Sequence, residues 1–197
     1  IINDNLGYIT RAVEVLGRGV ATLESNLVWA MITGNAKCTA DGKALFDNSH
    51  NNTGTGAIGV ASISDARQKM YNQKDFTGKN PLYVVPTYIL LPTALWTTFE
   101  VFNSPVSPTQ VGNANPFINK LQPIVEPRLD ASSTTQFYIV GEYPGVQHVV
   151  VGNLDGEAGP TISSEIKRDP DGIVTYLRHD FGCMVSQHQG FYRSTGA

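Results

Sequence analysis

The sequence is poor in charged residues and cysteines, and it has no long apolar run. Charged residues make up 16% of its 197 residues, against roughly 25% in an average soluble domain. The two cysteines, Cys38 and Cys183, lie far apart and form no CxxC pair, so we expect two reduced thiols and no disulfide framework. The most apolar stretch, Leu82–Leu91, contains Pro86 and is far shorter than the ~18 residues of a membrane span. We therefore expect no membrane partner.

An excess of basic residues is also lacking. The net charge is −3 and the isoelectric point is about 5.8. Tight nucleic-acid binding needs a basic patch and usually an isoelectric point above about 9, so this class of protein is excluded. Hydrophobic residues make up 41% of the chain, which excludes a disordered protein. A sparsely charged surface suits a protein that is covered by copies of itself.

The clearest periodic signal predicts one long helix over residues 8–33. Apolar residues recur at steps of four and three, which places them in a narrow stripe on one helix face. The stripe residues are Ile9, Val13, Leu16, Val20, Leu23, Leu27 and Ala30. We expect this stripe to pack on strands near 161–184, so that Leu23→Ala costs about 2–5 kcal/mol as a core truncation.

Two glycines, Gly17 and Gly19, interrupt this predicted helix. Glycine inside a helix costs about 1 kcal/mol relative to alanine. Either another backbone packs closely at these positions or the weakness is tolerated, and the sequence leaves both interpretations open.

Shorter elements are expected in the remainder of the chain. The sequence predicts a short strand near Lys43–Phe46, a helix from Ser62 as N-cap to about Gln73, a buried strand over Leu82–Leu91 that is bent or edge-like at Pro86, and a helix from Pro92 through Phe102. Further strands are expected near 120–126, 136–141, 146–152, 161–167, 173–179, 181–187 and 190–194. Strands in runs, rather than alternating with helices, predict an α+β fold.

Two motifs are candidates for chemistry. Gly54–Gly59 matches the GxGxxG dinucleotide fingerprint, but it follows a polar loop, so a glycine-rich surface loop is favoured. His179, Asp180, Cys183 and His188 cluster in sequence, yet positions 179 and 183 of a strand share a face that excludes 188. We expect no catalytic residue, no metal and no cofactor. The alternative function is a nucleotide-binding enzyme that uses the Gly54–Gly59 loop.

The C-terminal part of the chain carries a run of charges around a predicted hairpin. Asp169-Pro170-Asp171-Gly172 is a strong hairpin-turn signal. The surrounding acidic residues either form a solvated face or pair with arginines of a neighbouring subunit. The candidate inter-subunit contacts are Glu165, Arg168, Asp169, Asp171 and Arg178.

Several segments together resemble the major capsid (major head) proteins of tailed bacteriophages and prophages, above all the Mu-like group and the capsid half of chains fused to a prohead protease. Their order agrees with that family over nearly the whole chain. The segments are Asn3-Asp4-Asn5-Leu6-Gly7, Ala44-Leu45-Phe46-Asp47-Asn48-Ser49-His50, Met70-Tyr71-Asn72-Gln73-Lys74-Asp75, Gly78-Lys79-Asn80-Pro81-Leu82, Leu90-Leu91-Pro92-Thr93-Ala94-Leu95, Val125-Glu126-Pro127-Arg128-Leu129 and Leu177-Arg178-His179-Asp180-Phe181-Gly182.

The resemblance implies the Hong Kong 97-type capsid fold. Residues 1–34 with about 161–184 would form the peripheral (P) domain around a spine helix, and residues 35–160 with 185–197 would form the axial (A) domain. The N-terminal arm and the extended loop of that fold precede the spine helix, so we expect them upstream of Ile1.

The resemblance also implies a structural role without catalysis. Copies of the chain would assemble into the pentamers and hexamers of an icosahedral head. The other partners implied are a scaffold or prohead protease, the portal and, non-specifically, packaged DNA. The expected location is the virion capsid, reached from the host bacterial cytoplasm.

Overall fold

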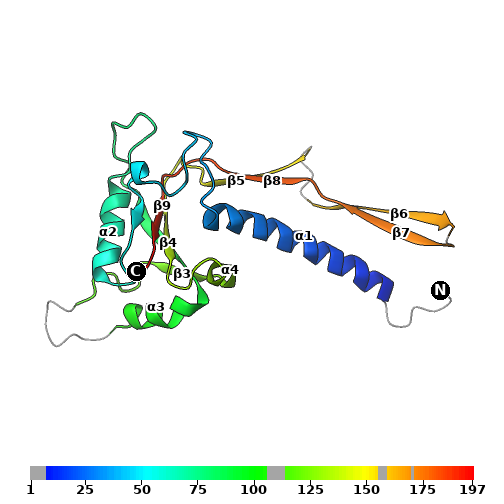
Figure 1. Cartoon of the computed structure of the whole chain (residues 1–197), viewed down its shortest axis with the longest axis horizontal. Coiled ribbons are helices and arrows are strands. Elements are labelled where there is room, and N and C mark those ends of the chain that lie inside the picture. Colours follow the sequence, from blue (N-terminus) through cyan, green and yellow to red (C-terminus); the bar gives the residue numbers. More distant parts are fainter. Residues whose placement is uncertain (1–7, 106–113, 155–158, 170) are drawn as a thin grey trace. The chain divides into compact units, whose positions relative to one another are not determined.

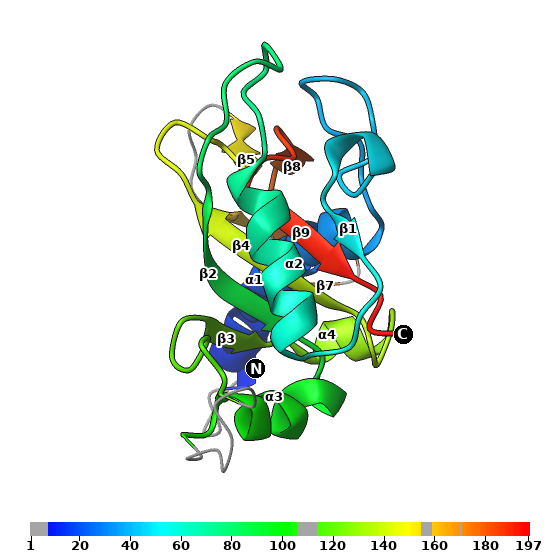
Figure 2. The same ribbon diagram turned by 90° about the vertical axis from the view of Figure 1, so that its left-hand side faces the viewer.

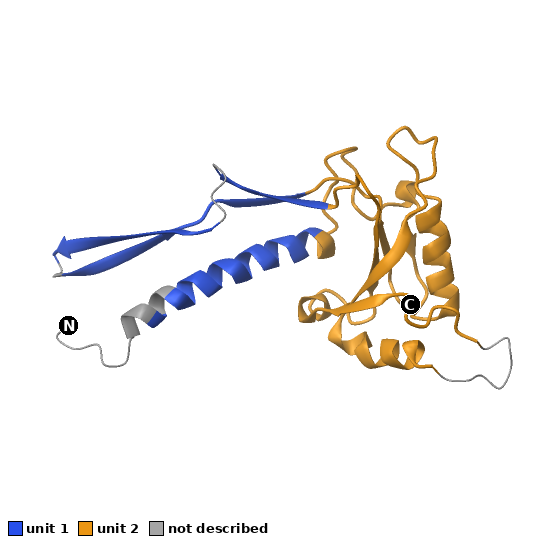
Figure 3. Ribbon diagram, turned by 180° about the vertical axis from the view of Figure 1, so that it is seen from behind, with its two compact units in different colours: residues 1–31, 149–184 blue, residues 32–148, 185–197 orange. Residues whose placement is uncertain are grey.

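The computed structural model describes residues 8–105, 114–154, 159–169 and 171–197 (Figure 1). The chain divides into two compact units, unit 1 (residues 1–31 and 149–184) and unit 2 (residues 32–148 and 185–197) (Figure 3). The chain therefore passes between the units three times, after residues 31, 148 and 184. Each unit contains both helix and strand, which confirms the mixed α and β content.

Unit 1 consists of most of one long helix and two pairs of strands. Helix α1 (Tyr8–Thr33) has 26 residues, as predicted, which corresponds to about 39 Å at ~1.5 Å per residue. Strand β5 (Val149–Asn153) pairs with β8 (Phe181–Val185). Strand β6 (Thr161–Arg168) pairs antiparallel with β7 (Asp171–Arg178) over eight residue pairs, from Thr161↔Arg178 to Arg168↔Asp171, which confirms the predicted hairpin.

The predicted apolar stripe on α1 is only partly covered. Val20 is buried, with 9% exposed, and Leu27 is half-buried. Leu16 and Leu23 are 46% and 56% exposed, so the prediction that they lie in a core of this chain is wrong. The side chains of Ile9 and Val13 lie outside the described residues.

Truncation of the exposed stripe is expected to leave the isolated chain stable. Because Leu23 is more than half exposed, Leu23→Ala should change the free energy of unfolding by less than about 0.5 kcal/mol, as for other surface positions. Val20→Ala is the control and should cost at least about 1 kcal/mol, since Val20 is buried. Urea denaturation of both variants measures the difference. A cost of 2 kcal/mol or more at Leu23, within the range of about 2–5 kcal/mol for a core truncation, would restore the original expectation.

Unit 2 is organised by a mixed five-stranded sheet in the order β1-β9-β4-β2-β3. The outer pairs β1–β9 and β2–β3 are parallel, and the inner pairs β9–β4 and β4–β2 are antiparallel. The strands are β1 (Thr53–Gly54), β2 (Val85–Leu91), β3 (Gln122–Val125), β4 (Phe137–Glu142) and β9 (Phe191–Ser194). Strand β4 is therefore the central strand of the sheet.

The core of unit 2 lies between the sheet and α2 (Val60–Tyr71), which Figure 2 shows in front of the strands. Ile63, Ala66 and Met70 recur at steps of three and four and bury the inner face of α2. They pack with fully buried residues of the sheet and with Phe99 of α3 (Trp96–Asn103). The sheet residues of this core are Ile89, Leu91, Phe137, Ile139 and Tyr192. The short helices η1 (Asn48–His50), η2 (Thr93–Leu95) and α4 (Pro127–Asp130) complete the unit.

Local backbone chemistry explains where predicted boundaries were wrong. Ser62 is not the N-cap of α2: Gly59 is, and the Ser62 hydroxyl reaches back to accept the Gly59 N–H at 3.1 Å. The strand expected near Lys43–Phe46 is reduced to a single bridge between Lys37 and Ala44. The helix expected from Pro92 begins as the 3-10 turn η2 and becomes α-helical only at Trp96.

Pro86 bends β2, as expected. The register with β4 shifts between Pro86 and Tyr88, and β3 pairs with β2 only from Tyr88 onward. Pro86 has no N–H to donate, and at this position no residue of β3 is paired with β2, so no hydrogen bond to β3 is lost.

The turn between α2 and β2 is built around Asp75. Its carboxylate accepts hydrogen bonds from Thr77 Oγ1 at 2.7 Å and from Asn80 Nδ2 at 2.9 Å. Gly78, at a φ of +71°, donates its N–H to Asp75 O at 2.9 Å. The side-chain hydrogen bonds from Thr77 and Asn80 lower the pKa of Asp75 to about 2.

This turn is expected to loosen in acid. Because the folded-state pKa of Asp75 is lowered, its stabilisation is complete above the ordinary value near ~4 and is lost as the pH falls through about 2. A carboxyl carbon NMR titration, followed with amide exchange at Gly78, measures both effects. Asp75→Asn is the control and should abolish the pH dependence of exchange at Gly78. Titration of Asp75 at an unshifted pKa would contradict this account.

Candidate functional site

The hairpin β6–β7 presents an exposed apolar face. Residues paired across an antiparallel ladder share a face, so the pairs Ile162↔Leu177 and Ile166↔Ile173 lie on the same side. Between them Ser164 and Thr175 bond each other at 3.3 Å. Ile166 and Ile173 are 76% and 69% exposed. Two neighbouring isoleucines that are this exposed are a candidate interaction surface. We call these four aliphatic residues, Ile162, Ile166, Ile173 and Leu177, the hairpin face.

The predicted contact charges are spread along the hairpin, with three at its tip, one at the other end and one between. Arg168 and Asp169 lie exposed at its tip, where Arg168 is paired in register with Asp171. Arg178 lies at the other end, opposite Thr161, and binds Asp180 through Nε at 2.9 Å. Glu165 lies between the ends and accepts from Tyr176 Oη at 3.4 Å. The side chain of Asp171 lies outside the described residues.

The histidines that cluster in sequence have different partners. His179 has a 6% exposed side chain, and its Nε2 lies 2.6 Å from Glu24 Oε1 of α1. The ring of His179 also stacks on Phe181 at 6.0 Å. His188 instead stacks on His50, with ring centroids 3.7 Å apart and planes 6° apart. His179 therefore has its partners within unit 1 and His188 within unit 2.

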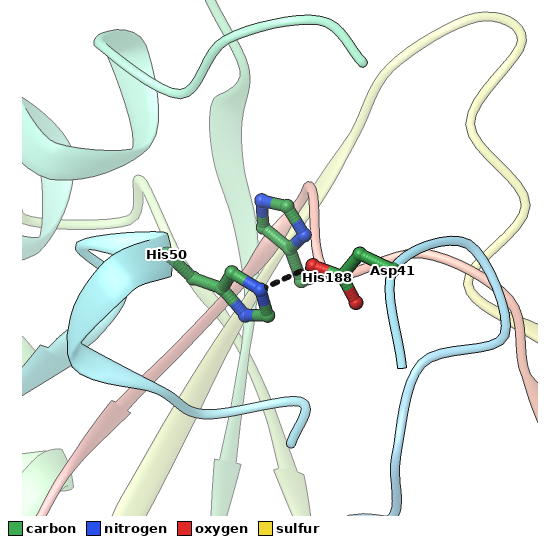
Figure 4. Close-up of side chains that lie close together, drawn as sticks. All are labelled: Asp41, His50 and His188. Atoms are coloured by element: carbon green, nitrogen blue, oxygen red, sulfur yellow. Dashed lines mark hydrogen bonds and ion pairs between the residues drawn. The ribbon is translucent and has the colours of Figure 1, made fainter. Parts of the chain in front are cut away.

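Sequence reasoning missed the group formed by Asp41, His50 and His188 (Figure 4). His50 Nε2 lies 2.7 Å from Asp41 Oδ2, and the His50 side chain is 3% exposed. Burial, with the nearby His50 ring, lowers the pKa of His188 to about 4, so that His188 is neutral at pH 7. No sequence motif marks this group, because its members come from three separate loops.

The Gly54–Gly59 loop lies between β1 and α2 and lines an open hollow of about 1040 Å³. From Asp47 to Asn52 the segment before this loop contains no strand, and only the two-residue strand β1, which includes Gly54 itself, follows it. The glycines serve packing: a Cβ on Gly54 would lie 1.9 Å from Tyr192 Oη. That hydroxyl donates to Asp65 Oδ2 at 2.8 Å, so an acidic side chain, together with Lys69, borders the hollow. A carboxylate there opposes a bound phosphate.

Both cysteines are free thiols. Burial, with Asp41 nearby, raises the pKa of the Cys38 thiol to about 11. A thiol that stays protonated is a poor nucleophile, so Cys38 has the properties of a packed apolar residue.

No helix among the described residues is long and apolar enough to cross a membrane. Among curated proteins, no sequence matches this chain significantly.

The fold is shared with a solved phage-related structure. A phage-related protein from Bordetella bronchiseptica RB50 superposes with a TM-score of 0.57 and 10% identity, over 100% of this chain and 67% of that chain. The procapsid of satellite phage P4, with its size determination (Sid) protein, gives a TM-score of 0.37 and 11% identity over 68% of this chain and 38% of that chain. The family of phage capsid proteins matches residues 1–194. The chain thus belongs to the phage capsid protein family, whose members form the head shell of the virion and are structural proteins rather than enzymes.

Proposed function

We propose that the chain is a major capsid subunit of a tailed phage or prophage with the Hong Kong 97-type fold, of the Mu-like or prohead-protease-fused group. In this proposal unit 1 is the peripheral domain, with α1 as the spine helix, and unit 2 is the axial domain. The observation that carries the proposal is the composition of unit 1, in which one long helix is joined by a hairpin from the distant C-terminal part of the chain.

Assembly follows from the surfaces that a single chain leaves uncovered. Leu16 and Leu23 on α1 are exposed, as are Ile162, Ile166 and Ile173 of the hairpin face, whereas Leu177 is half-buried. Head-to-tail contacts between such surfaces close into rings, here the pentamers and hexamers of a shell. Many weak contacts repeated over a shell give a stable particle.

The five contact charges of the hairpin orient neighbouring subunits and add little to the affinity between them. Arg168, Asp169 and Asp171 at the tip, with Glu165 and Arg178 further along, are proposed to pair with charges of the adjacent subunit. Exposed ion pairs contribute about 0–1 kcal/mol each, while charge patterns select the partner and fix the register.

The remaining partners are proposed to be a scaffold or prohead protease, the portal and packaged DNA. A chain of net charge −3 has little electrostatic attraction for DNA, so contact with the packaged genome is non-specific and weak. Assembly takes place in the host bacterial cytoplasm.

Hydrogen exchange tests the proposal on the shell itself. Amide exchange is compared between the free chain and shells of the complete capsid protein. Main-chain amides of β6 and β7 and of α1 should gain protection in the shell, because neighbouring subunits cover them. The control is β4, the central strand of unit 2, whose protection should not change. Equal exchange of β6–β7 in both states would overturn the role given to unit 1.

A further inference from the structure

Asp41, His50 and His188 bring three metal-binding side chains together within unit 2 (Figure 4). One ligand atom from each lies within 4.8 Å of the other two. Two imidazole nitrogens and one carboxylate oxygen are ligands that zinc and other first-row divalent cations accept. Asp41 is about a third exposed, so a cation has access from solvent.

His50 is oriented as a metal-binding histidine is. Its Nδ1 lies 3.2 Å from the carbonyl oxygen of Leu45 and its Nε2 lies 2.7 Å from Asp41 Oδ2, so both ring nitrogens face acceptors, and a cation at Nε2 would take the place of the proton that this nitrogen donates to Asp41. The same carbonyl accepts Asn52 Nδ2 at 2.7 Å, which holds it in place. In metal sites a ring N–H donated to a carbonyl fixes the tautomer and the ring orientation.

Asp41 and His188 lie on segments that are joined by backbone hydrogen bonds. Lys43 N donates to Asp41 Oδ1 at 3.1 Å, so the other carboxylate oxygen, Oδ2, is the one that faces the histidines and can bind a cation. In the same turn, Thr39 N donates to Val185 O at 2.9 Å and Ala40 N donates to Ser186 O at 3.2 Å. The turn that carries Asp41 is therefore fixed to the strand end that leads to His188.

We propose that Asp41, His50 and His188 bind one divalent transition-metal cation, with Zn²⁺ as the best fit, and that water completes its coordination. Ligand atoms around tetrahedral zinc are about 3.4 Å apart at bond lengths of ~2.1 Å. The stacked rings have parallel planes, so their lone pairs do not converge on one point. Binding therefore requires His188 to leave the stack by side-chain rotation. Its segment, 186–188, has no helix or strand to prevent this movement.

The bound cation would cross-link three segments of unit 2. These are the turn of Asp41, the 3-10 helix η1 with His50, and the segment that leads into β9. Lys43 is a neighbouring positive charge, and its Nζ donates to Ser49 Oγ at 3.0 Å. Repulsion between this ammonium group and the cation opposes binding. The cation replaces the Asp41–His50 pair and the ring stack with direct bonds.

Zinc titration of the metal-free chain tests the proposal. The purified 197-residue chain, treated with a chelator, is titrated with Zn²⁺ by calorimetry. One equivalent should bind and raise Tm. Asp41→Asn and His188→Gln should each weaken Kd at least about tenfold, as loss of a positioned ligand does. These two positions are preferred to His50, whose side chain is only 3% exposed, so that its replacement would also disturb buried packing. His179→Gln is the matched control, since His179 also pairs with a carboxylate, and should change Kd by less than about twofold.

X-ray absorption of the zinc-loaded chain gives an independent readout, because two imidazole ligands have a recognisable scattering pattern. Loss of one imidazole in His188→Gln would support the assignment. The proposal is overturned if Zn²⁺ does not bind at one equivalent. It is equally overturned if either Asp41→Asn or His188→Gln binds as the unaltered chain does, because the cation would then lie elsewhere.

Discussion

Phe137→Ala is expected to lower the free energy of unfolding of unit 2 by about 3–5 kcal/mol. Phe137 is fully buried on β4, the central strand of the sheet, and packs in the same core as Ile63 and Met70 of α2. The substitution leaves a cavity between α2 and the sheet. Because β4 is held by a strand on each side, the surrounding structure cannot collapse to fill this cavity, so the full cost of the lost contacts remains. Urea denaturation followed by circular dichroism measures the loss.

The control for this prediction is an exposed phenylalanine of the same unit. Phe76 is 94% exposed at the Asp75 turn, so Phe76→Ala should change stability by no more than about 0.5 kcal/mol. If Phe137→Ala cost less than 1 kcal/mol, the core described between α2 and the sheet would be wrong.

Ile166→Asp is expected to abolish shell formation while leaving the free chain folded. Ile166 is 76% exposed and pairs across the hairpin with Ile173, which is 69% exposed, so an aspartate there stays in water in the free chain. In an assembled shell the same carboxylate would be buried without a partner, which costs several kcal/mol per contact. Because this cost recurs at every subunit, the yield of particles should fall to zero rather than decrease in part. Electron microscopy and sedimentation of the complete capsid protein measure particle yield.

Ser163→Asp is the matched control for the assembly prediction. It introduces the same charge at another exposed residue of β6. Residues 163 and 166 are an odd number of positions apart, so Ser163 lies on the opposite side of the hairpin. Ser163→Asp particles should form in near-normal yield. Normal yield in Ile166→Asp would show that the hairpin face is not a contact surface of the shell.

Local signals in the sequence predicted α1 and the hairpin well. The steps of four and three between Val13 and Leu27, ended by Gly34, define the helix that the structure shows. The Asp-Pro-Asp-Gly sequence predicts the β6–β7 pairing because turn residues between two runs of β-forming residues are typical of a hairpin. Both elements depend on neighbours in the sequence.

Features that depend on distant residues were not predictable. The two-residue strand β1 exists only because β9 lies beside it. Gly54 matches a nucleotide fingerprint by sequence, yet it is required by the Tyr192 hydroxyl. The group of Asp41, His50 and His188 is assembled by backbone bonds between residues 39–40 and 185–186, which no pattern in either segment announces. The exposure of Leu23 was missed because periodicity reports an apolar face but not what covers it.

The threefold passage of the chain between units has a consequence for biosynthesis. Helix α1 leaves the ribosome early, but the strands of unit 1 are translated only after residues 32–148. At about 5–20 residues per second, unit 1 stays incomplete while most of unit 2 is already available to fold. The hairpin face therefore forms late, and only β8 and the final segment of unit 2 with β9 are translated after it. In the proposed assembly, a subunit can use the hairpin face to join its neighbours only when its own folding is nearly finished.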